Sequence, residues 1–315
     1  MACYSPLKGY RSKELSSTGK RTIVFNPKKG YPDMPLTVPC GNCIGCRLDR
    51  SKQWAIRCVN EASMHEDNCF LTLTYATPPE NNQLNKKHFQ DFMKKLRKKY
   101  AHKQIRYFQC GEYGEKLSRP HYHALIFGLD FEDKTFHKEH NGSPLFISEE
   151  LDKMWGHGHC WIGSVTFESA AYTARYILKK VNGKNATEHY ETLNEYGEYV
   201  EKLPEYITMS LGNRKPPEHP DHNRGIGYQW IKKYLHDTYK DDFIVINGRK
   251  YKPPRYYDNI LKEEDPELFA HIKAKRLEKT DPCHEDNSTH RLITRQTCKI
   301  AQISSLRRNY EETNV

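Results

Sequence analysis

Long apolar segments are missing from this sequence of 315 residues. No run approaches the roughly 20 apolar residues that a membrane-spanning helix needs. The start, MACYSPLKGYRSKEL, lacks the apolar stretch of a secretory signal. We therefore expect no membrane partner and a reducing, cytoplasmic setting. There the ten cysteines should be thiols or metal ligands rather than disulfides.

Two further features are missing, and each narrows the class of protein. There is no GxxxxGKS or GxxxxGKT phosphate loop and no internal repeat, so nothing indicates an attached ATPase. Hydrophobic residues make up only 37%, so much of the chain should be surface, loops and insertions. The length allows one large domain or one domain with extensions, and 12% aromatic residues can supply its core.

Positive charge is abundant, with a formal net charge of +10. This excess favours a polyanionic partner, of which nucleic acid is the commonest, although a merely basic soluble protein would show the same balance. Residues 85–100 have the pattern of an amphipathic helix with an apolar face. Its opposite face could bind backbone phosphates or could simply be solvated. That face consists of Lys86, Lys87, Lys94, Lys95, Arg97, Lys98 and Lys99.

Hydrophobic periodicity predicts an α+β fold with a central antiparallel sheet and flanking helices. The sheet is expected because short loops join successive strands, which requires antiparallel pairing. In residues 1–39 the only strand-like piece is 22–25. Strands are predicted at 69–75, 104–110, 121–127, 160–167 and 205–211, helices at 47–65, 85–100, 148–156, 168–182 and 226–239, and a hairpin at Asn247–Gly248.

Three regions are expected on this basis. Residues 1–66 form an N-terminal, cysteine-rich extension with a helix. Residues 67–212 form the core, in which 183–203 is an excursion. Residues 213–315 form a helical or irregular C-terminal extension, partly disordered.

The segment RPHYHALIFG places two histidines one residue apart at the start of an apolar strand. Side chains alternate across a strand, so His121 and His123 point to the same face, together with Leu125 and Phe127. Two neutral imidazoles at this spacing can bind one metal ion. Alternatively, they are two hydrogen-bonded, half-buried histidines.

A carboxylate is well placed to be a third ligand. Glu112 lies at the end of the preceding strand, and antiparallel pairing would bring it beside both rings. Glu115 is the second choice because it lies deeper in the turn. Imidazole and carboxylate together suit Mn²⁺, Mg²⁺ or Zn²⁺, with coordination positions left open for phosphate oxygen or water.

Two tyrosines occur at helical spacing in AAYTARYILKK. Tyr172 and Tyr176 lie on one helical face, separated by a rise of about 6 Å. Such pairs are usually core residues. A phenol is a weak nucleophile at neutral pH, but a divalent ion that polarises a phosphodiester, with a nearby cation, would make its attack competent.

Three motifs in this order resemble those of the HUH-endonuclease initiators of rolling-circle replication. They are FLTLTY, PHYHALIFG and YTARYILKK. Within that family the chain is most similar to the replication initiators of gokushovirus-type microviruses, where a segment like CGNCIGCRLDRSKQWAIRCVNEA precedes the first motif. The resemblance covers roughly residues 40–182.

The resemblance implies a viral initiator that nicks and rejoins an origin strand in the cytoplasm of a bacterial host. His121, His123 and Glu112 would bind the metal. One of Tyr172 and Tyr176 would form a 5′-phosphotyrosine link with single-stranded or supercoiled origin DNA, and the other would close the circle. The freed 3′-OH would serve a host DNA polymerase, and unwinding would need a host helicase.

One position departs from the related two-tyrosine initiators. Arg175 stands where they often have Lys between the tyrosines. A guanidinium is a poorer proton donor than an ammonium. If the leaving oxygen must be protonated, Lys179 is the candidate.

A cysteine group stands outside these motifs. Cys40, Cys43 and Cys46 form CxxCxxC, which is typical of part of a zinc site in a reducing compartment. Cys3 is the first choice for a fourth ligand, with Cys58 or a histidine as alternatives. Three unliganded thiols and an iron–sulfur cluster are the other interpretations. A zinc ion here would be structural.

Three rival functions remain open from the sequence. A non-enzymatic, zinc-containing DNA-binding protein would explain the charge and the cysteines but not the tyrosine pair. A metal phosphodiesterase that uses water would cut DNA without a protein–DNA adduct. A conjugative relaxase is related, but that class usually has a longer histidine cluster.

Overall fold

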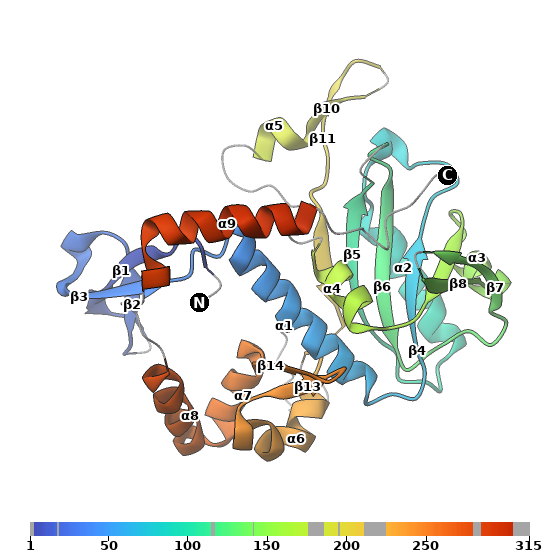
Figure 1. Cartoon of the computed structure of the whole chain (residues 1–315). Helices are drawn as coiled ribbons and strands as arrows, with labels where there is room; N and C mark the ends of the chain where they lie inside the picture. Colours follow the sequence, from blue (N-terminus) through green and yellow to red (C-terminus); the bar gives the residue numbers. More distant parts are fainter. Residues whose placement is uncertain are drawn as a thin grey trace. The chain divides into compact units, whose positions relative to one another are not determined.

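The computed structural model describes residues 3–17, 19–114, 117–140, 142–175, 186–194, 196–210, 225–279 and 285–304 (Figure 1). These residues fall into two compact units. The first unit joins the chain up to Arg50 with a segment that begins at Glu278. The second unit comprises Ser51–Leu277. Each unit is described by itself.

The first unit contains a small antiparallel sheet that the sequence did not reveal. Its strand order is β2-β1-β3, where the sequence predicted a single strand-like piece at 22–25. That prediction was too sparse because these strands are mostly exposed and carry little apolar alternation. The strands are β1 (Leu7–Leu15), β2 (Arg21–Val24) and β3 (Gly30–Val38), and helix α9 (Thr289–Ser304) completes the unit.

The second unit is built on an antiparallel sheet that has seven strands in the described chain. The strand order is β12-β5-β6-β4-β9-β8-β7. This sheet and its helices confirm the predicted α+β class. Strands β7 and β8 were not predicted, since they are polar and largely exposed. The strands are β4 (Asn68–Leu73), β5 (Arg106–Tyr113), β6 (Pro120–Phe127), β7 (Thr135–His140), β8 (Ser143–Ile147), β9 (Cys160–Gly163) and β12 (Tyr206–Met209).

Helices cover both faces of this sheet, and strand alternation decides which residues meet which helix. On one face, Leu71, Tyr122 and Ile126 pack with the apolar side of α2 (Lys86–Lys99) and with α3 (Glu149–Trp155). This apolar side of α2 was predicted correctly.

The other face of the sheet meets two different helices. Leu125 and Phe127 point to this face, as predicted. They pack with residues of α1 (Ile44–Ala62) and α4 (Phe167–Arg175).

A third hydrophobic core lies in the C-terminal part of the second unit. Ile56 of α1 packs among residues of α6, β13, α7 and α8. The predicted hairpin is present: Asn247 and Gly248 have φ values of 49° and 74°, as a type I′ turn requires. The elements are α6 (Tyr228–Asp241), β13 (Ile244–Ile246), β14 (Arg249–Tyr251), α7 (Arg255–Glu264) and α8 (Pro266–Glu278).

The excursion that the sequence predicted at 183–203 has its own small elements where it is described. Helix α5 (Ala186–Tyr190) leads into the antiparallel pair β10 (Glu191–Leu193) and β11 (Tyr199–Glu201). The hydroxyl of Tyr190 donates a hydrogen bond of 2.6 Å to Glu205. In the described part of the chain, no helix is long and apolar enough to cross a bilayer.

Candidate metal centre and nucleophile

Strand register brings three candidate ligands together. Strands β5 and β6 pair antiparallel with Glu112 directly opposite His121 and Cys110 opposite His123. Residues directly opposite one another in such a pair point to the same face, and so do residues two apart in one strand. Glu112, His121 and His123 therefore project together from the sheet face that α4 covers.

The three side chains converge on one point. Nε2 of His121 lies 2.7 Å from Oε1 of Glu112, and Nε2 of His123 lies 3.0 Å from the same oxygen. The two rings stand at 88° with centroids 4.9 Å apart. One donor atom from each residue falls within 4.8 Å of the others, so the group could hold a metal ion.

The far nitrogens of both imidazoles have partners that orient the rings. Nδ1 of His121 lies 3.2 Å from the backbone carbonyl of Arg119, which can only accept, so Nδ1 carries the proton and Nε2 its lone pair. Nδ1 of His123 lies 3.0 Å from the hydroxyl of Thr72 on β4. Such outer partners typically fix the tautomer of metal-binding histidines. Both Nε2 atoms thus face Glu112.

The site is buried and negatively charged. Glu112 and His123 are each only 1% exposed, and His121 is 6% exposed. Burial by itself would raise the pKa of Glu112. The two imidazoles beside it outweigh burial and lower that pKa to about 2. A carboxylate held in its ionised form between two imidazoles is suited to a divalent cation.

Tyr172 of α4 reaches the same point. Its hydroxyl lies 3.5 Å from Nε2 of His123, and the two rings meet edge to face at 5.0 Å. The hydroxyl of Ser51 on α1 donates a bond of 2.8 Å to the carbonyl of Ala171, which fixes this stretch of α4. The guanidinium of Arg175 lies 5.8 Å from the centre of the Tyr172 ring.

Two predicted site residues lie outside the described residues. They are Tyr176 and Lys179. Glu115, the second choice for the third ligand, lies outside them as well. Of the two candidate carboxylates, Glu112 is the one that the structure brings to the histidines.

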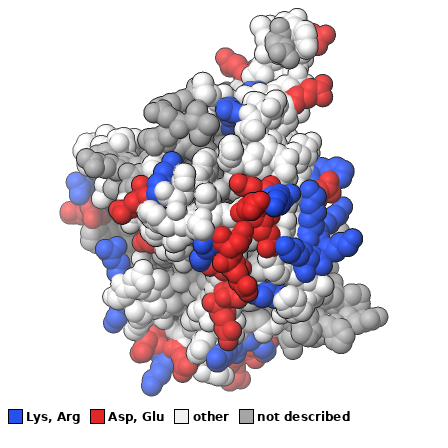
Figure 2. Space-filling view, turned by 90° about the vertical axis from the view of Figure 1, so that its right-hand side faces the viewer, with Lys and Arg blue, Asp and Glu red and all other residues white. Residues whose placement is uncertain are grey.

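The basic side of α2 does not reach this site. The apolar residues of α2 belong to the core on the opposite sheet face, so its lysines lie across the sheet from Tyr172. Several are engaged locally: Lys87 pairs with Asp91 at 2.5 Å and Lys99 with Glu150 at 2.9 Å. Figure 2 shows Lys and Arg side chains gathered beside a strip of Asp and Glu side chains.

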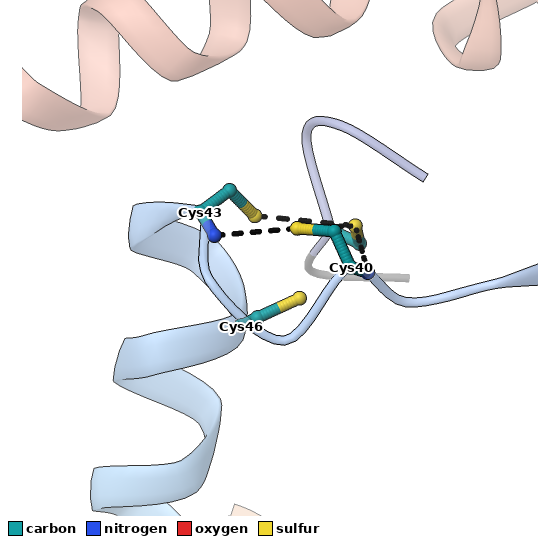
Figure 3. A group of neighbouring side chains, drawn as sticks. Cys40, Cys43 and Cys46 are labelled. Atoms are coloured by element: carbon teal, nitrogen blue, oxygen red, sulfur yellow. Dashed lines mark hydrogen bonds between the residues drawn. The ribbon is translucent and has the colours of Figure 1, made fainter. Parts of the chain in front are cut away.

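The cysteine group also assembles, in the first unit. Cys40 lies in the loop before α1, and Cys43 and Cys46 lie at the start of that helix, with their side chains pointing toward one another (Figure 3). Their sulfurs and that of Cys3 lie within 4.8 Å of one another. Cys58, the alternative fourth ligand, is instead buried in the core of the second unit.

Sequence reasoning did not identify the residues that orient the imidazoles. Thr72 and Phe70 belong to FLTLTY, which was recognised as a motif without a role for either residue. Phe70 stacks on His123 with ring centroids 5.6 Å apart. Strand alternation was the available signal, because Phe70 and Thr72 point to one face of β4, which pairs with β6 through Thr72 and His123.

Comparisons with known proteins agree with this site. Residues 68–181 match a family model for replication-associated proteins of the ORF2 type. The chain is 33% identical to the replication-associated protein VP4 of Bdellovibrio phage phiMH2K, over 87% of this chain and 82% of that protein. It is also 33% identical to the replication-associated protein ORF2 of Spiroplasma virus 4, over 88% and 86%. No solved structure is significantly similar to the chain.

The antiparallel sheet, the paired histidines and the adjoining tyrosine are consistent with a viral replication initiator. The chain belongs to the replication-associated protein family of the microviruses. The resemblance drawn from the three motifs is thereby confirmed.

Proposed function

We propose that this protein initiates rolling-circle replication of a small viral genome by cutting the origin strand with a tyrosine. The observation that carries the proposal is the position of the Tyr172 hydroxyl, 3.5 Å from Nε2 of His123 in the Glu112–His121–His123 group. Family membership supports a role in DNA replication.

The three side chains fit a divalent metal ion. Two Nε2 atoms and one carboxylate oxygen supply a mixed donor set that suits Mn²⁺ or Mg²⁺, and also Zn²⁺. Three protein ligands leave coordination positions open for phosphate oxygens. When bound, the ion would polarise the scissile phosphodiester.

Tyr172 acts as the nucleophile in this proposal. Its oxygen bonds to phosphorus, the bond from phosphorus to the 3′ oxygen breaks, and the strand to the 3′ side stays joined to the protein. The phenol proton is released, and the departing 3′ oxygen takes up a proton. One phosphodiester replaces another, so rejoining needs no ATP.

The remaining chemistry falls to groups around Tyr172. Arg175 places a cation beside its ring and would stabilise charge on the transferring phosphate. Tyr176, one helical turn further along the sequence, would make the second cut, and Lys179 would protonate a leaving oxygen. A host polymerase would extend the free 3′-OH, and a host helicase would open the duplex.

Covalent capture tests the proposal. A single-stranded oligonucleotide from the parent origin, labelled on the segment 3′ of the nick, is incubated with protein and Mn²⁺ and separated on a denaturing gel. We expect a labelled band at protein mass that disappears with EDTA and in the Tyr172→Phe/Tyr176→Phe double variant. Tyr199→Phe is the matched control, since Tyr199 is 80% exposed, and it should retain the band.

The other outcomes of this gel contradict the proposal in different ways. Cleavage without a labelled protein band would mean that water is the nucleophile. Binding without cleavage, on every origin fragment and with each of Mn²⁺, Mg²⁺ and Zn²⁺, would mean a non-enzymatic DNA-binding protein.

A further inference from the structure

The four cysteines of the first unit have the spacing of ligands on a single ion. The sulfur of Cys3 lies 3.7 Å from that of Cys40 and 3.9 Å from that of Cys43. Around one zinc ion with bonds of about 2.3 Å, a regular tetrahedron separates its sulfurs by about 3.8 Å. We propose that Cys3, Cys40, Cys43 and Cys46 bind one zinc ion in a closed, structural site.

Backbone amides support this set of thiolates. The N–H of Tyr4 donates to Cys43 at 3.3 Å, that of Cys40 to Cys3 at 3.3 Å, and that of Cys43 to Cys40 at 3.2 Å. Four thiolates around a divalent ion leave two excess negative charges. Hydrogen bonds from N–H groups to the sulfurs disperse that charge, as outer partners do at other metal sites.

The same geometry argues against the rival interpretations. A disulfide would bring two sulfurs to about 2.05 Å, far closer than the Cys3 sulfur comes to those of Cys40 and Cys43. In a four-iron cluster each thiolate binds a separate iron at a corner of a cube, so the sulfurs stand farther apart than on one ion. Four sulfurs within 4.8 Å of one another therefore favour a single ion.

The first unit has little else to hold it together. Among the described residues up to Arg50, Cys3 is the only hydrophobic residue that is buried. Leu292 is the corresponding residue in the described part of α9. A unit of this size without an apolar core normally depends on disulfides or a metal.

The four ligands stand where a metal would fasten this unit. Cys3 precedes β1, and Cys40 follows β3, so the ion closes the segment that contains the whole three-stranded sheet. Cys43 and Cys46 tie that closure to the start of α1, where the N–H of Arg47 donates to the carbonyl of Cys43 at 3.0 Å. All four positions are taken by protein ligands, which is typical of a structural rather than a catalytic zinc site.

Metal analysis of the full-length protein tests this assignment. The His121→Ala/His123→Ala variant is used as the background, so that the other candidate metal group does not contribute. We expect about one zinc per chain by mass spectrometry of the elements. Cys43→Ser in this background should lose most of it. Cys298→Ser, which removes an exposed thiol of α9, is the matched control and should keep it.

Two further measurements do not depend on how well the cysteine variant folds. Cobalt exchanged into the background variant should give the visible bands and sulfur charge-transfer absorption of a tetrahedral thiolate site. Removing zinc with a chelator should expose β1–β3 to limited proteolysis by trypsin. No bound zinc, iron with inorganic sulfide, or zinc retained by Cys43→Ser would each overturn the assignment. Because the background lacks both histidines, the result does not depend on nicking.

Discussion

The hydroxyl of Tyr172 lies 3.5 Å from Nε2 of His123, although the two residues are 49 positions apart in the sequence. The contact exists because α4 packs on the sheet face to which His121, His123 and Glu112 all point. The proposed nucleophile and metal ligands thus share one buried location, which the chain builds from β5, β6 and α4.

Thr72 should control how well the histidines bind metal. Replacing Thr72 with Val keeps the shape of the side chain but removes the partner of Nδ1 of His123, 3.0 Å away. Loss of such an orienting partner typically weakens metal binding 10–100-fold. We expect Thr72→Val to weaken Mn²⁺ affinity by about that factor, measured by titration calorimetry of the metal-free protein.

Thr74→Val is the control for this prediction. The Thr74 hydroxyl donates to the carbonyl of His159 and has no role at the site, so its removal should leave Mn²⁺ affinity unchanged. Equal affinities for Thr72→Val and the unmodified protein would show that the threonine does not orient the ring.

The cation beside Tyr172 should matter more than the cations of α2. Arg175 is exposed and lies 5.8 Å from the Tyr172 ring, where it can meet a transferring phosphate. We expect Arg175→Ala to slow cleavage about tenfold, which corresponds to about 1.4 kcal/mol of transition-state stabilisation. Arg175→Lys, which keeps the charge, should retain most of the rate in single-turnover cleavage of the labelled oligonucleotide.

Lys98→Ala removes the same charge from the opposite sheet face. Lys98 is an exposed residue of α2, so we expect its cleavage rate to stay within about twofold of the unmodified protein. If Lys98→Ala and Arg175→Ala slow cleavage equally, the charge acts through general attraction of DNA and not through its place at the site.

A buried ion pair should make the stability of the second unit depend on acid. Glu61 of α1 accepts from Arg106 at 2.5 Å and from the backbone N–H of Gly227 at 2.7 Å. Burial alone would raise the pKa of Glu61, but His65, Arg106 and this N–H together lower it. Because the folded-state pKa lies below the ordinary value of about 4.3, the carboxylate stabilises the fold above that pH and loses this effect as the pH falls.

Glu61→Gln should therefore reduce the free energy of unfolding by about 3–5 kcal/mol at pH 7, since it leaves Arg106 buried without a charged partner. The difference from the unmodified protein should shrink as the pH drops below about 4.3. Urea unfolding followed by tryptophan fluorescence measures it, because all four tryptophans, Trp54, Trp155, Trp161 and Trp230, lie in the second unit. Glu149→Gln, at an exposed pair with Lys153, should change stability by less than about 1 kcal/mol. A pH-independent difference for Glu61→Gln would contradict this account.

The sequence was most informative where residues follow strand or helix periodicity. His121 and His123 share a face because strand side chains alternate, and the hairpin offset placed Glu112 opposite them. The turn at Asn247–Gly248 was predicted because few residue pairs adopt two successive positive φ values. The core side of α2 followed from the spacing of its apolar residues.

Other parts could not be predicted from periodicity. The strands β1–β3 and β7–β8 are largely exposed, so they lack the apolar alternation that reveals a strand. The role of Thr72 depends on pairing between β4 and β6, which no local pattern records. Packing of α6 and α7 around Ile56 of α1 joins residues about 200 positions apart, and only the folded chain shows it.

The attachment site of the DNA tests the central claim most directly. Trypsin cuts after Arg175, so Tyr172 falls in the peptide 154–175 and Tyr176 in the peptide 176–179. After cleavage of an origin oligonucleotide and nuclease trimming, mass spectrometry of the digest should find a nucleotide on Tyr172. A nucleotide found only on the peptide 176–179 would contradict the role given to Tyr172, and cleaved DNA with no modified peptide would contradict a tyrosine nucleophile altogether.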